Sequence, residues 1–310
     1  MNYSKYQFTV PSEKKCRLIC DTDAFNEADD QFAIVQAMLS PKIENVAFVA
    51  AHYGLKRHQD SMERSFDELH RVFAAADCPF DDIIVKGAPH PLTDTREPLV
   101  SEGAKVIVEE AMKDDFRPLY VIFLGPLTDL ACAYLMEPRI AGRLTAIWIG
   151  GGTYPKGGIE FNLGNDIIAA NIIMDSAIDL WQVPKNVYEM MSVSFAELQY
   201  KVATQGKLGA YLFQQLLDHT LQDAPRKSKF RTGETWVLGD SPAVGLILYE
   251  HRFECDMISA PHIHADMTYE LTDRERKIRV YRHIDSRLIL DDLFAKLALF
   301  DPQGWDSVSQ

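Results

Sequence analysis

The stretch Arg17-Leu-Ile-Cys-Asp-Thr-Asp-Ala-Phe-Asn-Glu-Ala-Asp-Asp-Gln-Phe-Ala-Ile34 joins an apolar run to an acidic turn and then to the start of a helical pattern. Leu18 to Cys20 is continuously apolar, which predicts a short buried strand. Apolar residues then recur at helical spacing from Phe32 to Leu39. The acidic segment is therefore predicted to be the loop at the carboxyl end of a strand, which is where open α/β sheets bind ligands.

The acidic loop carries Asp21, Asp23, Asp29 and Asp30 within ten residues. Like charges at this density in a partly dry crevice would raise one another's pKa values unless a cation lay among them. A hard divalent cation such as Ca²⁺ binds carboxylate, carbonyl and water oxygens, whereas Zn²⁺ would call for His or Cys, and only Cys20 borders the loop. The loop thus favours a hard-metal site.

Helix capping is the alternative interpretation of the same carboxylates. Asn26, Asp29 and Asp30 could cap the helix that follows and interact favourably with its dipole. Capping explains the end of the loop but leaves Asp21 and Asp23 at its start unexplained.

Length and composition limit the fold and the ligand. At 310 residues with 47% hydrophobic content, the chain can bury a large core as one α/β domain or as two small ones. Its formal net charge of −13 argues against a nucleic-acid surface, which relies on clustered Lys and Arg, and favours a small neutral or cation-assisted substrate.

The cysteines and the apolar segments indicate the cellular setting. Five cysteines are scattered without a CxxC pair, and the sequence contains neither an apolar leader nor an apolar span of about 18 residues. We therefore expect a soluble, reduced, cytoplasmic protein that does not enter a membrane.

Strand-like and helical patterns alternate through the first half of the chain, which is typical of βαβ units and a mostly parallel sheet. Expected strands lie at Leu18–Cys20, Val46–Ala51, Ile83–Val85, Tyr120–Leu124 and Leu144–Ile149, and expected helices at Asp30–Leu39, Asp60–Ala75, Ala104–Met112 and Leu127–Leu135. In the second half, helices are expected at Asn165–Ser176, Phe195–Val202, Ala210–Leu221, Pro242–Tyr249 and Leu288–Leu299, with a strand at Ile278–Tyr281.

The sequence contains no linker-like stretch and no internal repeat. Asp223–Lys229, which includes Pro and basic residues, best fits a mobile insertion. The sequence therefore predicts a single α/β domain over residues 1–310, with a mostly parallel central sheet flanked by helices and a Rossmann-like core.

A second informative stretch, Leu119-Tyr-Val-Ile-Phe-Leu-Gly-Pro-Leu-Thr-Asp-Leu-Ala131, is an apolar strand that breaks at Gly-Pro before a helix. The break brings backbone carbonyls to the carboxyl edge of the sheet, so a carbonyl around Thr128 could complete the shell of a hard cation. The alternative is an ordinary strand-to-helix turn in which Thr128 caps the helix.

A third stretch, Gly150-Gly-Gly-Thr-Tyr-Pro-Lys-Gly-Gly-Ile-Glu-Phe-Asn-Leu-Gly-Asn165, is glycine-rich and follows a strand. It matches neither GxGxxG nor GxxxxGK[ST], so it is not a phosphate loop. Glu160 could accept hydrogen bonds from the hydroxyls of a sugar, and Asn162 could both donate and accept them. A plain surface loop is the alternative.

A fourth stretch, Trp236-Val-Leu-Gly-Asp-Ser-Pro-Ala-Val-Gly245, places Asp240 directly before a Ser-Pro helix start. Pro is favoured in the first helical turn, so Asp240 or Ser241 could simply cap this helix. If Asp240 points inward, it supplies a further metal carboxylate from a distant part of the chain.

Taken in order, Asp21-Thr-Asp23 with Asp29-Asp30, then Gly-Pro-Leu-Thr-Asp-Leu-Ala, Glu-Phe-Asn and Asp240-Ser-Pro resemble the inosine-uridine preferring nucleoside hydrolases. The resemblance covers about residues 17 to 250. It implies a single α/β domain, bound Ca²⁺, and cleavage of the N-glycosidic bond of ribonucleosides to ribose and free base, by a homodimer or homotetramer.

The resemblance also assigns roles to residues at the matching positions. Asp23 would bind Ca²⁺ and act as the general base toward a metal-held water. Asp30, the Thr128 carbonyl and Asp240 would complete the protein ligands of the metal. Asp29, Glu160 and Asn162 would hold the ribose hydroxyls. Asp21 would support the metal ligands from behind.

The chain departs from the family pattern at three points. Five residues, Ala24 to Ala28, separate Asp23 from the aspartate pair where the pattern has three. Gly239 takes the place of the His that helps to protonate the leaving base in many members, and Thr95-Arg-Glu-Pro98 lies where some members carry His-Gly. His52 and Trp236 are the candidates to replace this acid at the leaving base, although a lone His near a strand end is more often structural.

Two other functions use the same residues. In a haloacid-dehalogenase-like phosphatase, Asp21 would be the nucleophile, Asp23 the general acid and Mg²⁺ the metal, but that family does not predict the Asp29-Asp30 pair or Glu-Phe-Asn. In a non-catalytic Ca²⁺-dependent binder of nucleosides or sugars, the metal site would remain without the leaving-group acid.

Overall fold

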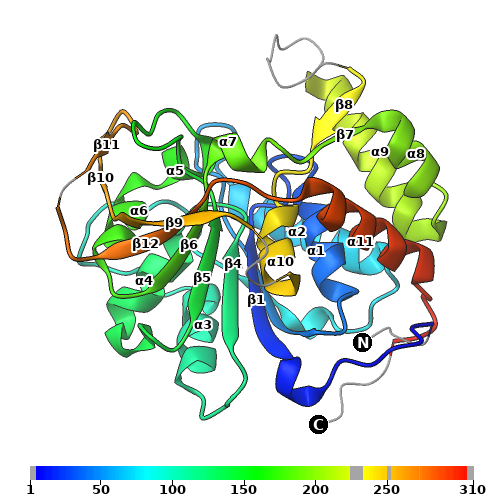
Figure 1. The fold of residues 1–310 in the computed structure, drawn as a ribbon, viewed down its shortest axis with the longest axis horizontal. Helices are drawn as coiled ribbons and strands as arrows, with labels where there is room; N and C mark the ends of the chain where they lie inside the picture. Colours follow the sequence, from blue (N-terminus) through cyan, green and yellow to red (C-terminus); the bar gives the residue numbers. More distant parts are fainter. Residues whose placement is uncertain (1–4, 224–232, 250–252, 272, 306–310) are drawn as a thin grey trace.

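The computed structural model describes residues 5–223, 233–249, 253–271 and 273–305. Its central sheet has eight strands in the order β3-β2-β1-β4-β5-β6-β12-β9 (Figure 1). Neighbouring strands are parallel except for β12 and β9. The strands are β1 (Cys16–Thr22), β2 (Ile43–Ala50), β3 (Ile84–Lys86), β4 (Leu119–Phe123), β5 (Thr145–Ile149), β6 (Asp179–Val183), β9 (Cys255–Ser259) and β12 (Lys277–Tyr281).

The strand order reverses between β1 and β4. The chain runs outward from β1 through β2 to β3, returns to β4 beside β1, and then runs outward on the other side through β5 and β6. The loops that leave β1 and β4 therefore diverge, and the crevice between them is the expected ligand site of such a sheet.

Helices cover both faces of the sheet (Figure 1). Alternate residues of β1 point to opposite sides, because Leu18 and Cys20 pack in one apolar cluster and Ile19 in the other. A strand buried on both faces must be continuously apolar, which explains the pattern in the sequence. The first cluster includes residues of α1 (Asp30–Met38), α2 (Ser61–Ala75), α9 (Gly206–Asp223), α10 (Ser241–Leu248) and α11 (Ser286–Leu299); the second includes residues of α3 (Glu102–Met112), α4 (Thr128–Met136) and α6 (Ile167–Asp175).

Smaller elements complete the fold. They are α5 (Phe161–Asn165), α7 (Lys185–Tyr188), α8 (Phe195–Lys201), the antiparallel pair β7 (Ser192–Ser194) and β8 (Thr235–Val237), the pair β10 (His262–Ile263) and β11 (Tyr269–Glu270), and three 3-10 turns at Ser12–Lys14, Asp81–Ile83 and Pro138–Ile140.

The structure confirms the predicted single α/β domain with a mostly parallel sheet, and each predicted strand and helix has a counterpart shifted by at most a few residues. The sequence patterns missed β6 and β9. β6 is a short strand whose buried Gln182 interrupts the apolar run, and β9 is an antiparallel edge strand of mixed exposure. The proposed insertion Asp223–Lys229 lies outside the described residues apart from Asp223, which ends α9.

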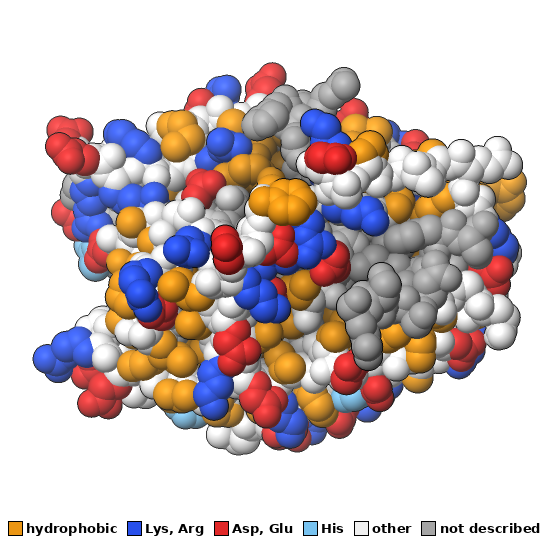
Figure 2. Space-filling view, turned by 90° about the horizontal axis from the view of Figure 1, so that it is seen from below, with side chains coloured by type: hydrophobic (Ala, Val, Ile, Leu, Met, Phe, Trp, Pro, Cys, Tyr) orange, Lys and Arg blue, Asp and Glu red, His pale blue; other side chains and the backbone are white. Residues whose placement is uncertain are grey.

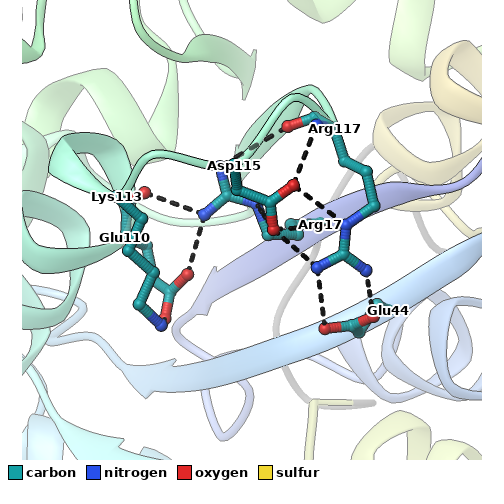
Figure 3. A network of polar contacts seen from close by, with 6 residues as sticks. All are labelled: Arg17, Glu44, Glu110, Lys113, Asp115 and Arg117. Atoms are coloured by element: carbon teal, nitrogen blue, oxygen red, sulfur yellow. Dashed lines mark hydrogen bonds and ion pairs between the residues drawn. The ribbon is translucent and has the colours of Figure 1, made fainter.

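An ionic network ties the amino ends of the strands together (Figure 3). The buried Arg17 guanidinium donates to the carboxylate of Glu110 at 2.9 Å and to its carbonyl at 2.8 Å, and forms an ion pair with Asp115. Arg117 pairs with Asp115 and with Glu44. These contacts join β1, β2, α3 and the segment before β4, so they fix the sheet at the end opposite to the acidic loop.

The outer face seen from below mixes basic, acidic and apolar side chains, and no patch of one sign dominates it (Figure 2). None of the described helices is both long enough and apolar enough to cross a lipid bilayer.

Candidate active site

A cavity of about 170 Å³ opens at the carboxyl ends of the strands. One water needs about 10–15 Å³ measured in the same way, so the cavity has room for a small organic molecule. It is lined by segments that are far apart in the sequence, namely Asp23, Asn26, Glu27, Asp29, Asp30, Leu124, Ile149, Glu160, Phe161, Asn162, Lys185, Tyr188, Glu189, Trp236, Val237, Gly239 and Asp240.

Three carboxylates form the centre of this cavity. Asp29, Asp30 and Asp240 are buried, and each offers an oxygen such that these atoms all lie within 4.8 Å of one another. The helices α1 and α10 pack against each other, which brings Asp240 to the aspartate pair. Both helices begin here, so their amino-terminal dipoles favour the negative charge.

Helix capping does not explain these residues. Asp29 and Asp240 occupy the N-cap positions of α1 and α10, but neither side chain accepts a capping hydrogen bond. Asp30 accepts instead from the Thr22 hydroxyl at 2.5 Å. The carboxylates are therefore turned toward one another and toward the cavity.

Asp23 directly follows β1 at the start of the acidic loop, beside this cluster. It is 1% exposed, and its Oδ2 has no hydrogen-bond partner among the described residues. A Cβ atom at Gly125 would lie 3.0 Å from the Asp23 Cγ, so a side chain at this position of the strand-to-helix break would press on the Asp23 carboxylate. Asp21 lies behind, fully buried, with both carboxylate oxygens unpaired within the described chain, and it does not line the cavity.

Burial dominates the electrostatics of the site. It raises the pKa values of Asp23, Asp29 and Asp240 well above their usual range, and the neighbouring carboxylates raise them further. Burial also raises the pKa of Asp30 to about 7. Without a cation the cluster therefore holds protons near neutral pH, and a divalent cation would replace them.

The donor set fits a hard divalent metal. The three clustered ligand atoms are carboxylate oxygens of Asp29, Asp30 and Asp240. Asp23 Oδ2, which has no hydrogen-bond partner among the described residues, offers a further ligand atom. Oxygen-only sites suit Ca²⁺ or Mg²⁺ rather than Zn²⁺.

Glu160 and Asn162 form a further part of the cavity wall. Glu160 caps α5 and accepts from the backbone N–H groups of Gly151, Asn162 and Leu163 at 2.8 to 3.2 Å. The Asn162 amide donates to the carbonyl of Leu124, which follows β4, at 2.7 Å and to that of Ile149, which ends β5, at 2.9 Å. Asn162 therefore links the carboxyl ends of two neighbouring strands at the cavity.

Thr128 does not line the cavity, contrary to its predicted place in the metal shell. The helix α4 begins at Thr128, so its carbonyl is directed along the helix, and its hydroxyl donates to Asp166 Oδ2 at 2.8 Å. Leu124, directly before Gly125, lines the cavity instead. The residue of this stretch that lines the cavity therefore precedes the Gly-Pro break rather than following it.

His52, for which a contact with substrate was predicted, also does not appear among the residues that line the described cavity. Its Nδ1 accepts from the Gly54 N–H at 3.0 Å, so the proton is on Nε2, which donates to the Thr128 hydroxyl at 2.8 Å. Burial lowers the His52 pKa to about 3, so the ring stays neutral. His52 stabilises the strand-to-helix turn of β4 and α4.

Comparison with known proteins agrees with this geometry. The sequence model described as inosine-uridine preferring nucleoside hydrolase matches residues 18–291. The chain belongs to this family. The matched range contains all the carboxylates of the cavity, and the assignment sets aside the haloacid-dehalogenase-like phosphatase, whose nucleophile would be the cavity-remote Asp21.

Curated relatives of this family member match over shorter segments. "Probable uridine nucleosidase 2" of Arabidopsis thaliana is 29% identical over 121 residues, which are 37% of this chain and 37% of that protein. "Pyrimidine-specific ribonucleoside hydrolase RihB" of Escherichia coli strain K12 / DH10B is 25% identical over 132 residues, which are 41% of this chain and 42% of that protein. The chain thus aligns with about two fifths of the length of each relative.

Solved nucleoside hydrolases share the fold over nearly the whole chain. The plant nucleoside hydrolase PpNRh1 has a TM-score of 0.74 at 18% identity and covers 91% of this chain and 99% of its own. The purine-preferring ribonucleoside hydrolase from Gardnerella vaginalis has a TM-score of 0.72 at 18% identity and covers 91% and 98%.

The sequence patterns missed several residues that line the cavity. Lys185 and Tyr188 lie on α7, which is a single turn, and Glu189 follows it. No periodicity marks so short a helix, and the only signal was the Pro184 that starts it. Trp236, a sequence candidate for contact with the base, does line the cavity.

The raised pKa of Asp30 makes the stability of the metal-free protein depend on pH. Because the folded pKa of about 7 exceeds the ordinary value of 3.8, the folded state binds this proton more tightly than the unfolded chain does. The resulting stabilisation is complete below about pH 4 and is lost as the pH rises through about 7. With a chelator present, we expect the melting temperature to fall between about pH 5 and pH 8 more steeply for the wild type than for Asp30→Asn.

Differential scanning calorimetry of both proteins, with and without Ca²⁺, measures this difference. Added Ca²⁺ should raise the wild-type melting temperature most at the higher pH, because proton and metal compete for the same oxygens. Equal pH slopes for the two proteins in chelator would show that Asp30 does not titrate in this range.

Proposed function

We propose that the protein is a Ca²⁺-dependent hydrolase that cleaves the N-glycosidic bond of ribonucleosides to ribose and free base. The observation that carries the proposal is the convergence of Asp23, Asp29, Asp30 and Asp240 from distant segments on one cavity, which Glu160 and Asn162 also line. Family membership supports the reaction class. A non-catalytic binder would share this cavity and is distinguished by the absence of turnover.

The metal would be held by the carboxylates of Asp23, Asp30 and Asp240 and by the Leu124 carbonyl, which replaces that of Thr128 in our assignment. When bound, Ca²⁺ would offset the repulsion among the carboxylates and make a nearby water more acidic. Asp21, buried behind Asp23, would support the site through its negative charge.

Asp23 is proposed as the general base because its Oδ2 is buried and unpaired among the described residues. It takes one proton from a water as the oxygen of that water forms a bond to the anomeric carbon. The C–N bond breaks, its electron pair leaves with the nucleobase, and the nucleobase takes a proton from solvent water while Asp23 keeps the proton of the attacking water. Direct displacement without a covalent intermediate inverts the anomeric carbon.

Asp29, Glu160 and Asn162 are proposed to hold the ribose hydroxyls. Cleavage of the C–N bond builds positive charge on the sugar ring, and preorganised carboxylates around it stabilise that charge. Their fixed positions also align the anomeric carbon with the attacking water. Both effects require the rigid wall that the contacts of Glu160 and Asn162 create.

The names of the relatives include uridine, pyrimidine-specific and purine-preferring enzymes, so we propose ribonucleosides as the substrate class without fixing the base. A role in nucleoside salvage follows from this reaction. The proposal also includes a homodimer or homotetramer and a cytoplasmic location, which suits five cysteines that are all free thiols.

Asp23→Asn should reduce kcat by about a hundredfold or more, because an amide cannot accept the proton. Release of reducing sugar from a panel of purine and pyrimidine nucleosides measures the loss, and wild-type turnover on this panel tests the function itself. Asp94→Asn, at an exposed carboxylate outside the cavity, is the control. An unchanged kcat in Asp23→Asn would remove the proposed base.

Asp240→Ala should weaken Ca²⁺ binding by about tenfold or more, because it removes a charged oxygen ligand supplied from the far end of the chain. Calorimetric titration with Ca²⁺ measures the affinity. Asp285→Ala is the matched control, since Asp285 is a true helix cap whose carboxylate accepts from the Leu288 N–H. Loss of that cap should lower stability by about 1 kcal/mol without changing the Ca²⁺ affinity. If both variants bind Ca²⁺ like the wild type, Asp240 is not a ligand.

A further inference from the structure

Tyr188, on the short helix α7, lines the cavity and has no role in the mechanism so far. We propose that Tyr188 is a positioning and specificity-determining residue: its hydroxyl orients Glu160 toward the ribose, and its ring occupies the space that a side chain at position 239 would need. This inference rests on the proposed function and adds a residue to it.

The first support is the hydrogen bond between Tyr188 and Glu160. The Tyr188 hydroxyl donates to Glu160 Oε1 at 3.1 Å. The other oxygen, Oε2, accepts from two backbone N–H groups, those of Gly151 and Leu163, at 2.8 Å each. Among backbone donors, Oε1 accepts from the Asn162 N–H at the longer distance of 3.2 Å. Oε1 is therefore the less firmly held oxygen, and Tyr188 fixes its direction.

The Tyr188 hydroxyl remains a donor at neutral pH. Burial and the adjacent Glu160 charge both raise its pKa far above the usual value of tyrosine. Its proton is directed at Glu160 and not toward a leaving base, so Tyr188 acts through Glu160 rather than as the leaving-group acid.

The second support is the glycine at position 239. A Cβ atom there would lie 3.1 Å from Tyr188 Cδ2 and 3.3 Å from Asp29 Oδ2. Gly239 does not have the positive φ that favours glycine, so space rather than backbone conformation explains this residue. The Tyr188 ring packs against Gly239, next to Asp29, while its hydroxyl binds Glu160.

Tyr188 thus contacts one group that we assign to the ribose and borders the place of another. Its hydroxyl binds Glu160, and its ring lies against Gly239, which Asp29 also borders. In the resemblance that the sequence shows, position 239 is the place of the histidine acid. In this chain the side chain beside position 239 is Tyr188, whose hydroxyl is already bonded to Glu160. We therefore assign this side of the cavity to recognition of the sugar.

The experiment compares Tyr188→Phe, Glu160→Gln and the wild type on one cleaved ribonucleoside and on its 2′-, 3′- and 5′-deoxy analogues. Tyr188→Phe keeps the ring and removes only the hydroxyl. We expect KM for the full riboside to rise about tenfold with a smaller change in kcat, because the interaction is lost in both ground and transition states. On the deoxy analogue that lacks the hydroxyl held by Glu160, Glu160→Gln should no longer raise KM relative to the wild type. Tyr188→Phe should no longer raise KM on that same analogue.

Two further variants separate the ring from the hydroxyl and from general stability. Gly239→Ala should raise KM even though the hydroxyl is present, since its Cβ would press on the Tyr188 ring and on the Asp29 carboxylate. Tyr249→Phe is the control, because it removes a tyrosine hydroxyl that binds the carboxylate of Asp292 outside the cavity, and it should leave the kinetics unchanged.

The outcomes are distinguishable. If the Tyr188→Phe penalty is the same on every deoxy analogue, Tyr188 contributes only to structure and the inference is overturned. If Gly239→Ala behaves like the wild type, the steric part of the inference is wrong. If the wild type neither cleaves any riboside nor binds ribose by calorimetry in the presence of Ca²⁺, the proposed function itself fails and the inference falls with it.

Discussion

The burial of like charges is the constraint on which the rest of the structure depends. Asp23, Asp29, Asp30 and Asp240 are each less than a tenth exposed, and burial raises all their pKa values. A protein that keeps such a cluster must supply protons or a cation, because unpaired buried charge is strongly unfavourable. The surrounding fold favours negative charge at this place. The sheet reverses its strand order here, and two helices direct their amino-terminal dipoles at the cluster.

The part of the cavity wall formed by Glu160 and Asn162 is held by contacts that cross between elements. The Asn162 amide joins the ends of β4 and β5, and Glu160 collects donors from three backbone positions and from Tyr188. Such multiply held groups lose little freedom when a ligand binds, so they can orient a sugar with small entropic loss. The Arg17 network at the opposite end fixes the strands that carry the cavity (Figure 3).

Local patterns in the sequence were enough to predict the fold and the acidic loop. Continuous apolar strands, helical periodicity and a dense run of aspartates are all encoded within a few residues. The placement of Leu124 at the cavity was not predictable, because the folded path of the Gly125-Pro126 break, rather than the local sequence, decides that Leu124 lines the cavity and Thr128 does not. The neutral, fully bonded state of His52 was equally hidden, since it follows from partners distant in sequence. Tyr188 escaped notice because a single-turn helix has no periodicity and its partner Glu160 is far along the chain.

The most direct test of the account is the position of a calcium ion in crystals grown with Ca²⁺, located by anomalous diffraction. The account predicts one ion in the cavity, with oxygens of Asp23, Asp30 and Asp240 and the Leu124 carbonyl at about 2.3–2.6 Å. An ion bound elsewhere, or an empty carboxylate cluster at a saturating Ca²⁺ concentration, would contradict it.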